Sequence, residues 1–387
     1  MFKQTTAIFL LTALCFGQHS RPTKHVLTNW SEFHRHNMTR YNPYEKFLTV
    51  NNVKNLGVKW SFDPGGWVQS SPSVVNGVIY VGGGSYQNSN MYALDAHTGA
   101  VRWSLGSYFE YSSPAVVKGV VYIGSDDGNV YALKAGTGDK LWSYQTSGPV
   151  YSSPTVVNGV VYVGSGDDNV YALNARTGEK LWSYPTSGYF VSSPAVVHGV
   201  VYIGSIDHNL YALNALTGAK LWSFTAGDHV YTSPAVAGGV VYFGSSDYNI
   251  YALKASTGAK LWSYATKDYA DSSPAVAKGV VYMGSYDGNV YALNARTGEK
   301  LWSYYAGYDG VDSSPAVANG VVYVGSGLGY VLAINARTGA LLWSYSGVGQ
   351  EDSSPAVVNG VVYVGSARGL YAFSLKHGAH SNSKPSK

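Results

Sequence analysis

The chain has 387 residues, of which 45% are hydrophobic and 12% are charged, and its formal net charge is +4. This composition excludes a largely disordered chain, and the single cysteine excludes a disulfide framework. Residues 70–375 hold 15 Lys and Arg against 19 Asp and Glu, a net charge of −4 that argues against a nucleic-acid-binding surface.

The first residues have the pattern of an export signal. Lys3 precedes an apolar run, residues 7–14, that is too short to span a bilayer as a stable anchor. We therefore predict a signal peptide over residues 1–17 and an exported protein, either periplasmic or secreted to the cell surface. Lipidation of Cys15 is a minor alternative, because Leu14 stands where a small residue is usual. We assign residues 18–55 to a lead-in segment and expect deletion of residues 1–50 to leave the rest stable.

The remaining sequence repeats at an interval of about 40 residues. A Ser-Pro step recurs at this interval from Pro72 to Pro355. Tryptophans recur at gaps of 43, 39, 40, 40, 40, 40 and 41 residues, at Trp60, Trp103, Trp142, Trp182, Trp222, Trp262, Trp302 and Trp343. A fixed period of this size in a strand-rich sequence predicts the blades of a β-propeller.

One repeat unit, residues 152–184, contains four predicted strands. Asn158-Gly159 is a strong two-residue hairpin signal and joins the strand 153–157 to the strand 160–163. A polar turn at 166–169 leads to the strand 170–173, and a Thr-Gly turn leads to a last strand that ends at Tyr184. Four antiparallel strands in about 40 residues make one propeller blade.

The ends of the repeat region are complementary. The last unit stops after residue 375 without a fourth strand, and residues 56–62 supply one at the other end. Because ring closure removes two exposed sheet edges, we predict an all-β, eight-bladed propeller over residues 56–375, closed by the N-terminal strand. We expect a monomer with no transmembrane span, and a disordered polar tail over residues 376–387.

Residues 172–182, Ala-Leu-Asn-Ala-Arg-Thr-Gly-Glu-Lys-Leu-Trp, resemble the tryptophan-docking motif of quinoprotein-type propellers, with Ala, Gly and Trp at its first, seventh and eleventh positions. Six further units match in full, and the last unit keeps Ala372 and Gly378 and would borrow Trp60. The resemblance implies that the eight tryptophans are structural and stack on neighbouring blades. The family includes pyrroloquinoline-quinone (PQQ) dehydrogenases of alcohols and sugars. It also includes non-catalytic propellers similar to the lipoprotein of the outer-membrane β-barrel assembly machinery, which bind protein segments.

The composition favours the non-catalytic branch. The dehydrogenases typically carry adjacent cysteines and long insertions that hold the cofactor, and this chain has neither, nor a Cys-x-x-Cys-His haem motif. PQQ is a tricarboxylate that requires cations around it, whereas the loops between blades are rich in Asp and Glu and hold only Lys267 and Arg368 as cations. We predict no cofactor and no catalytic residues. A PQQ- or Ca²⁺-dependent oxidoreductase of alcohols or sugars remains the alternative, with PQQ and Ca²⁺ as its cofactors.

The loops between blades are where the units differ from one another, so we expect a ligand there. Asp271, Asp312 and Asp352 hold the same position in three successive units and are expected to converge near the channel mouth, where they could hold a cation or a base. The aromatic candidates are Trp67, Tyr111, Tyr151, Tyr231, Tyr269 and Tyr308. Aromatic rings beside carboxylates suit a protein segment or a glycan. The competing interpretation is solvated loop acids and rings that only fill the centre.

Two further sets of loop residues have simpler interpretations. Asp127, Asp167, Asp207, Asp247 and Asp287 recur in strand-to-strand turns, where Asp caps its own backbone. His208 and His229 fall in loops that could meet, but they lack a metal-ligand spacing, and we predict no metal site.

Overall fold

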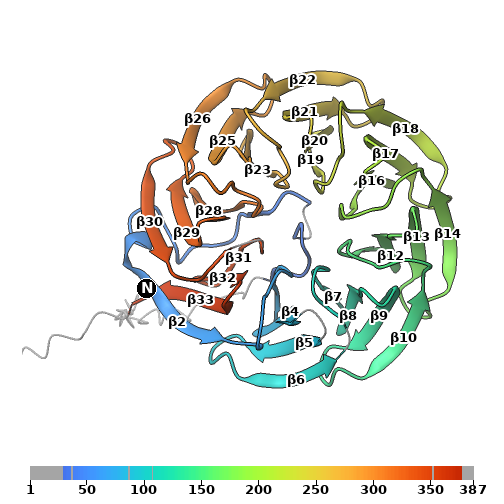
Figure 1. Ribbon diagram of the computed structural model, residues 1–387, viewed down its shortest axis with the longest axis horizontal. Helices are drawn as coiled ribbons and strands as arrows, with labels where there is room; N and C mark the ends of the chain where they lie inside the picture. Colours follow the sequence, from blue (N-terminus) through green and yellow to red (C-terminus); the bar gives the residue numbers. More distant parts are fainter. Residues whose placement is uncertain (1–28, 36–37, 86–87, 107, 351–352, 377–387) are drawn as a thin grey trace, which may run out of the picture.

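The computed structural model describes residues 29–35, 38–85, 88–106, 108–350 and 353–376. Eight four-stranded antiparallel blades are arranged in a ring, which confirms the predicted architecture (Figure 1). Within the ranges just given, no helix is long and apolar enough to cross a membrane. The helical content of these ranges is one short 3-10 turn, η1 (Val53–Asn55).

Blades 1–4 each consist of four strands that are consecutive in the sequence. Their bounds are β3 (Ser73–Val75), β4 (Val78–Ser85), β5 (Asn88–Asp95) and β6 (Val101–Gly106) in blade 1, β7 (Ala115–Val117), β8 (Val120–Gly124), β9 (Asn129–Lys134) and β10 (Lys140–Gln145) in blade 2, β11 (Thr155–Val157), β12 (Val160–Gly164), β13 (Asn169–Asn174) and β14 (Lys180–Pro185) in blade 3, and β15 (Ala195–Val197), β16 (Val200–Gly204), β17 (Asn209–Asn214) and β18 (Lys220–Thr225) in blade 4.

Blades 5–7 repeat this order, and blade 8 takes its outer strand from the beginning of the chain. The bounds are β19 (Ala235–Ala237), β20 (Val240–Gly244), β21 (Asn249–Lys254) and β22 (Lys260–Ala265) in blade 5, β23 (Ala275–Ala277), β24 (Val280–Gly284), β25 (Asn289–Asn294) and β26 (Lys300–Tyr305) in blade 6, β27 (Ala316–Ala318), β28 (Val321–Ser326), β29 (Tyr330–Asn335) and β30 (Leu341–Ser346) in blade 7, and β31 (Ala356–Val358), β32 (Val361–Ser366), β33 (Gly369–Leu375) and β2 (Leu56–Phe62) in blade 8.

The N-terminal strand closes the ring in the predicted register. In β2, Trp60 lies opposite Ala372 of β33, just as Trp182 lies opposite Ala172 inside blade 3. The closing blade therefore has the same four-stranded form as the others, although its strands come from both ends of the chain.

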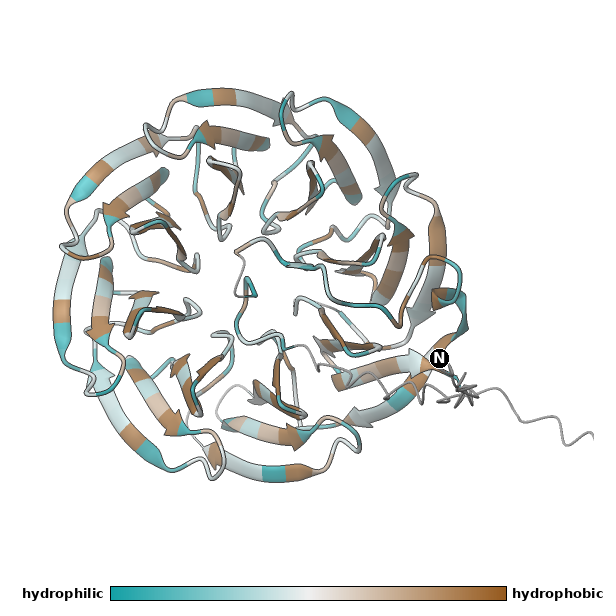
Figure 2. Cartoon of the chain, turned by 180° about the vertical axis from the view of Figure 1, so that it is seen from behind, coloured by the Kyte–Doolittle hydropathy of each residue, from teal (hydrophilic) through white to brown (hydrophobic). Residues whose placement is uncertain are grey.

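Strand burial follows position in the blade. The second strand of a blade, such as β12, is buried along most of its length because other blades cover both of its faces. The outer strand, such as β14, alternates between exposed and buried residues, because one of its faces meets solvent. Figure 2 shows the same contrast as mostly brown inner strands and outer strands with bands of teal and brown. The apolar core is thus divided among clusters that each join adjacent blades.

Each of the eight repeated tryptophans links its blade to the next. The indole N–H of Trp142 donates to the carbonyl of Ala175 at 3.1 Å, and six other indoles make the equivalent bond to a turn alanine at 2.9–3.3 Å. The indole of Trp343 donates instead to the carbonyl of Leu56 in β2 at 3.1 Å. The Thr-Gly turn leaves room for the ring. A Cβ at Gly178 would lie 2.8 Å from the Trp142 indole, and its φ of +76° also favours glycine.

The second serine of each Ser-Ser-Pro step forms a continuous hydrogen-bonded circle around the channel. The backbone N–H of each of these serines donates to the hydroxyl oxygen of its counterpart in the next blade at 2.8–3.0 Å. The members are Ser71, Ser113, Ser153, Ser193, Ser233, Ser273, Ser314 and Ser354. Since these groups are buried, the circle satisfies backbone donors that water cannot reach.

Part of the lead-in segment lies inside the channel and follows its wall (Figure 1). The innermost strand of every blade is an edge strand with unpaired backbone groups. Strand β1 (Tyr41–Asn42) pairs in parallel with β27. Arg40 of the lead-in accepts from the Val317 N–H of β27 at 3.0 Å. The lead-in also accepts backbone N–H bonds from inner strands of other blades, as shown by Val116 to Ser31, Val236 to Met38 and Val276 to Thr39 at 2.7–3.2 Å.

Arg40 anchors this segment and is fully buried. Its guanidinium donates to the carbonyls of Pro315 at 3.0 Å, Pro355 at 2.9 Å and Phe33 at 2.6 Å, and it lies 4.6 Å from the centre of the Phe33 ring. Arg40 therefore holds its part of the lead-in segment against blades 7 and 8. Our expectation that residues 1–50 could be removed without effect does not agree with these contacts.

Candidate functional site

The loops between blades and the turns between second and third strands share one face, which we call the mouth face. The two sets of segments are joined by backbone bonds, such as the one from the Tyr286 N–H to the Tyr269 carbonyl at 2.9 Å. The opposite face, here the turn face, carries the first-to-second and third-to-fourth strand turns. Ala96 N–H donates there to the Gly77 carbonyl at 3.0 Å.

The repeated aspartates of the mouth-face turns hold the loops together. In the turn before β13, one carboxylate oxygen of Asp167 accepts from the Asn169 N–H at 3.2 Å. The other accepts from the Tyr171 hydroxyl at 2.7 Å and the Ser147 N–H at 2.8 Å. Because this carboxylate is already bonded within the protein, it is poorly placed to receive a ligand.

Tyrosines from successive blades form a row on the mouth face. The ring of Tyr269 lies 5.4 Å from that of Tyr248 and 5.8 Å from that of Tyr286. All three rings are exposed. Sequence reasoning selected Tyr269 as a candidate but missed its partners, because they lie in the turns of two different blades. Elsewhere on this face, the exposed ring of Tyr111 packs edge-on against that of Tyr151, with 5.3 Å between the ring centres.

The other aromatic candidates lie apart from this row or beneath the surface. Tyr308 is 77% exposed. Trp67 is exposed beside Gly84, whose N–H donates to the Trp67 carbonyl at 2.8 Å. Tyr231 is half-buried. Burial raises the pKa of its hydroxyl, and the nearby Tyr189 and Asp271 raise it further.

The three equivalent aspartates are not all described. Asp352 lies outside the described residues, so a three-carboxylate site stays a prediction. Asp271 accepts hydrogen bonds from the Ser246 hydroxyl at 3.0 and 3.2 Å. Burial raises the pKa of Asp271 to about 6, and the charges of Asp228 and Asp268 add to the shift. Asp312 is half-buried in the loop before β27.

Two other acids of this face, Glu110 and Asp126, also have raised pKa values. Burial, followed by the charges of Glu110 and Asp127, raises the pKa of Asp126 to about 7, and burial also raises the pKa of Glu110. Glu110 belongs to the loop before β7 and Asp126 to the turn after β8, so their proximity depends on how the two segments pack. The sequence showed only that both loops are acidic.

His208, Asp228 and His229 come together at the mouth face of blade 4. The two imidazole rings are 4.9 Å apart and nearly perpendicular. Asp228 Oδ1 lies 3.7 Å from Nε2 of His208 and 3.7 Å from Nδ1 of His229. The two histidines therefore meet, although their sequence spacing did not indicate a site.

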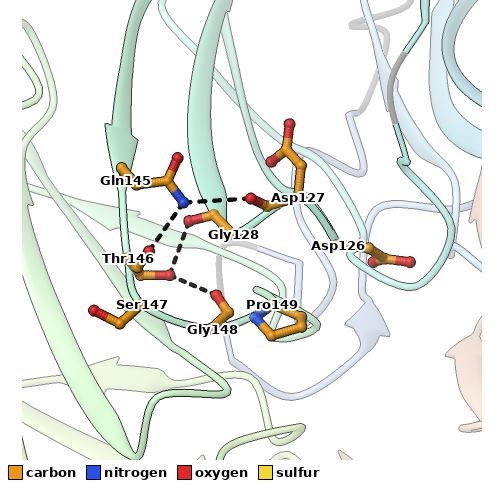
Figure 3. Close-up of a pocket in the computed structure, with 8 residues that line it drawn as sticks. All are labelled: Asp126, Asp127, Gly128, Gln145, Thr146, Ser147, Gly148 and Pro149. Carbon is orange, nitrogen blue, oxygen red and sulfur yellow. Dashed lines mark hydrogen bonds between the residues drawn. The ribbon is translucent and has the colours of Figure 1, made fainter.

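A pocket of about 240 Å³ opens between blades 2 and 3 and is lined by residues 126–128 and 145–149 (Figure 3). Its polar groups bond mainly to one another. Gln145 Nε2 donates to the carbonyls of Asp127 and Thr146, and the Thr146 hydroxyl donates to those of Gly128 and Gly148, at 2.7–3.3 Å. Because the pocket is smaller than the usual range of ligand sites, about 300–1,000 Å³, it is a weak candidate.

Comparison with known proteins identifies the family. The family model described as outer membrane protein assembly factor BamB matches residues 91–195 and 185–383. The chain belongs to this family. Among solved structures, BamB from Moraxella catarrhalis is similar with a TM-score of 0.71 at 22% identity, over 84% of this chain and 99% of that one.

Quinoprotein dehydrogenases share the BamB-type propeller fold. The quinohemoprotein alcohol dehydrogenase ADHIIG from Pseudomonas putida HK5 has a TM-score of 0.79 at 20% identity, over 93% of this chain and 82% of that one. In sequence, a 1-butanol dehydrogenase (cytochrome c) from Thauera butanivorans is 31% identical over 122 residues. That match covers 28% of this chain and 17% of the dehydrogenase, so it spans less than a fifth of the relative.

The mouth face fits PQQ poorly. This face carries Glu110, Asp126, Asp228 and Asp271, and burial together with neighbouring carboxylates raises the pKa of Asp126 and that of Asp271. Of the two loop cations, Arg368 donates to the carbonyl of Gly347 at 2.9 Å. Since each added negative charge would increase the repulsion, these side chains are unfavourable to PQQ, and the absence of a cofactor stays a prediction.

Proposed function

We propose that this chain is an exported, non-catalytic propeller that holds an extended segment of another protein across its mouth face. The observation that carries the proposal is the row formed by Tyr248, Tyr269 and Tyr286, which lies beside Asp228, Asp268 and Asp271. The family description, outer membrane protein assembly factor, supports a protein ligand.

The spacing of the row suits an extended backbone. In a β-strand, side chains on the same face repeat at about 6.6–6.8 Å, and the tyrosine rings are 5.4 and 5.8 Å apart. Successive same-face side chains of a bound strand can therefore each meet one ring. Exposed rings of this kind supply large contact areas with little loss of conformational entropy.

The charge of the site predicts the character of the segment. The charges of Asp228 and Asp268 help to raise the pKa of Asp271, so the carboxylates lie near enough to repel one another. A Lys or Arg side chain would relieve this repulsion. A basic strand with alternating aromatic residues is therefore the expected ligand class, and a glycan is the second candidate because exposed tyrosines also stack on sugars.

The test uses fluorescence anisotropy with two labelled peptides, one alternating Lys and Tyr and the other alternating Glu and Tyr. We expect the Lys peptide to bind the full chain more tightly. Tyr269→Ala and Asp271→Asn should each weaken binding by about tenfold or more, as central interface contacts do. The matched control is Arg296→Ala on the turn face, where the side chain is exposed and far from the row.

Equal affinity for the two peptides, or a larger loss from Arg296→Ala than from Tyr269→Ala, would refute the assignment. A glycan array and a titration with PQQ and Ca²⁺ cover the alternatives. Saturable glycan binding that Tyr269→Ala abolishes would replace the peptide with a sugar. Tight PQQ binding with dye-linked alcohol oxidation would replace the scaffold with an oxidoreductase.

A further inference from the structure

Two imidazoles and one carboxylate converge on the mouth face between blades 4 and 5. His208 lies in the turn between β16 and β17, and Asp228 and His229 lie in the loop between β18 and β19 (Figure 1). We propose that these three residues bind a divalent transition-metal ion of the zinc type. This site does not depend on the proposed peptide-binding function, and it departs from the sequence expectation of no metal.

The distances suit a single ion. One candidate ligand atom from each residue lies within 4.8 Å of those of the other two. Oδ1 of Asp228 is 3.7 Å from Nε2 of His208. Ligand atoms of a tetrahedral zinc site, at about 2.0–2.1 Å from the ion, are about 3.3 Å apart. Side-chain rotations that bring the ligand atoms closer together by up to about 1.5 Å would therefore complete the site.

The neighbouring backbone already orients two of the ligands. Nδ1 of His229 lies 2.5 Å from the carbonyl oxygen of Ile206. This bond places the ring proton on Nδ1 and leaves the Nε2 lone pair for an ion, which is the usual arrangement of a metal-bound histidine. The backbone N–H of His229 donates to Oδ1 of Asp228 at 2.7 Å and holds that carboxylate in place.

The donor set selects the class of ion. Two imidazoles and a carboxylate suit zinc and similar ions, whereas Ca²⁺ and Mg²⁺ prefer oxygen ligands alone. All three residues are half-buried and open to solvent. Three protein ligands leave a coordination position for water or for a donor atom of a bound molecule.

Blade 5 provides the same geometry without metal ligands. Its equivalents of His208 and His229 are Tyr248 and Tyr269, whose rings are 5.4 Å apart. Tyr248 has a φ of +71° and His208 a φ of +72°. Tyrosine therefore satisfies the backbone and ring packing at these positions. A pair of histidines is not required for packing, so the competing interpretation, a simple aromatic contact, can be separated from metal binding by substitution.

The test is isothermal titration of the EDTA-treated full chain with ZnCl₂, with CaCl₂ and MgCl₂ as comparison ions. We compare the wild type with His208→Tyr combined with His229→Tyr, which copies blade 5, and with Asp228→Asn. The control is His198→Asn on the turn face, which copies Asn158 of blade 3. Histidines outside the described residues remain in every variant, so any zinc they bind is common to all. Thermal unfolding with and without zinc provides a second readout.

We expect one zinc site in the wild type and in His198→Asn, with a zinc-dependent rise in thermal midpoint. The double tyrosine variant should lose this site and the rise, while its midpoint without zinc stays within a few degrees of the wild type. Asp228→Asn should weaken zinc binding by about tenfold or more. Zinc binding in the double variant with wild-type affinity and stoichiometry, or a wild type that responds equally to CaCl₂, would overturn the proposal.

Discussion

The backbone N–H of Ser354 in blade 8 donates to the hydroxyl oxygen of Ser71 in blade 1 at 3.0 Å, across 283 residues of sequence. This bond closes the serine circle, because the other seven members are joined blade by blade in chain order. Ring closure therefore involves contacts at both radii, among them the pairing of β2 with β33 at the outer rim and the Ser354–Ser71 bond at the channel.

The first prediction concerns this inner contact. Ser71→Ala should lower the free energy of unfolding by about 1–3 kcal/mol, because it leaves the buried N–H of Ser354 without an acceptor. Guanidinium denaturation measures the change. The control is Ser183→Ala at an exposed position of β14, where we expect a change within about 0.5 kcal/mol. Equal effects of the two substitutions would show that the circle does not stabilise the ring.

The second prediction concerns the N-terminal segment. Deletion of residues 1–62 removes β2 and exposes the edge of β33, so the thermal midpoint should fall well below that of a chain lacking residues 1–28. Deletion of residues 1–50 should give an intermediate midpoint, since it removes the channel contacts but keeps β2. Circular dichroism melting measures all three. Identical midpoints for the shortest and longest deletions would contradict closure by the N-terminal strand.

The third prediction isolates Arg40. Arg40→Lys keeps the charge but cannot reach the carbonyls of Phe33, Pro315 and Pro355 together, so it should cost about 2–4 kcal/mol of unfolding free energy. Arg337→Lys, at an exposed turn, is the matched control and should change stability by less than about 0.5 kcal/mol. A null result at Arg40 would mean that the lead-in segment only lies in the channel and does not hold blades 7 and 8 together.

The fourth prediction is a dependence on pH. The pKa of Asp126 is raised from an ordinary 3.8 to about 7 in the folded protein. The stabilisation that comes from the protonated carboxyl of Asp126 is therefore present below pH 4 and is lost as the pH rises through 7. Above that pH, Asp126 carries a charge in the folded state that its surroundings disfavour. Asp126→Asn removes that charge and should stabilise the protein by about 1 kcal/mol at pH 8, after allowance for solvent screening.

The stabilisation by Asp126→Asn should shrink as the pH falls toward 4, and urea denaturation at several pH values measures it. Asp309→Asn, in an exposed loop of the same face, controls for a general reduction of negative charge. If Asp126→Asn destabilises the protein at pH 8, the carboxylate is favourable there and the assigned pKa direction is wrong.

The sequence could indicate that the candidate site lies on the mouth face. Asp271 and Tyr269 stand out because they vary between otherwise equivalent loops, and this variation is visible in the sequence. The side chains that lie next to them in space could not be predicted in this way. Tyr286 meets Tyr269, and Glu110 influences Asp126, only because a loop and a turn pack together on one face. The distance between such side chains depends on blade twist and ring radius.

The sequence by itself determined the blade, the number of blades and the strand that closes the ring, because these features follow from local turn chemistry and a 40-residue period. Tertiary structure alone decided how the lead-in segment and the mouth face are assembled. Arg40 finds its acceptors 275 and 315 residues away, and His208 meets His229 across a loop. The physical reason is that such contacts depend on where the closed ring places each segment in space, and a one-dimensional pattern carries no information about those distances.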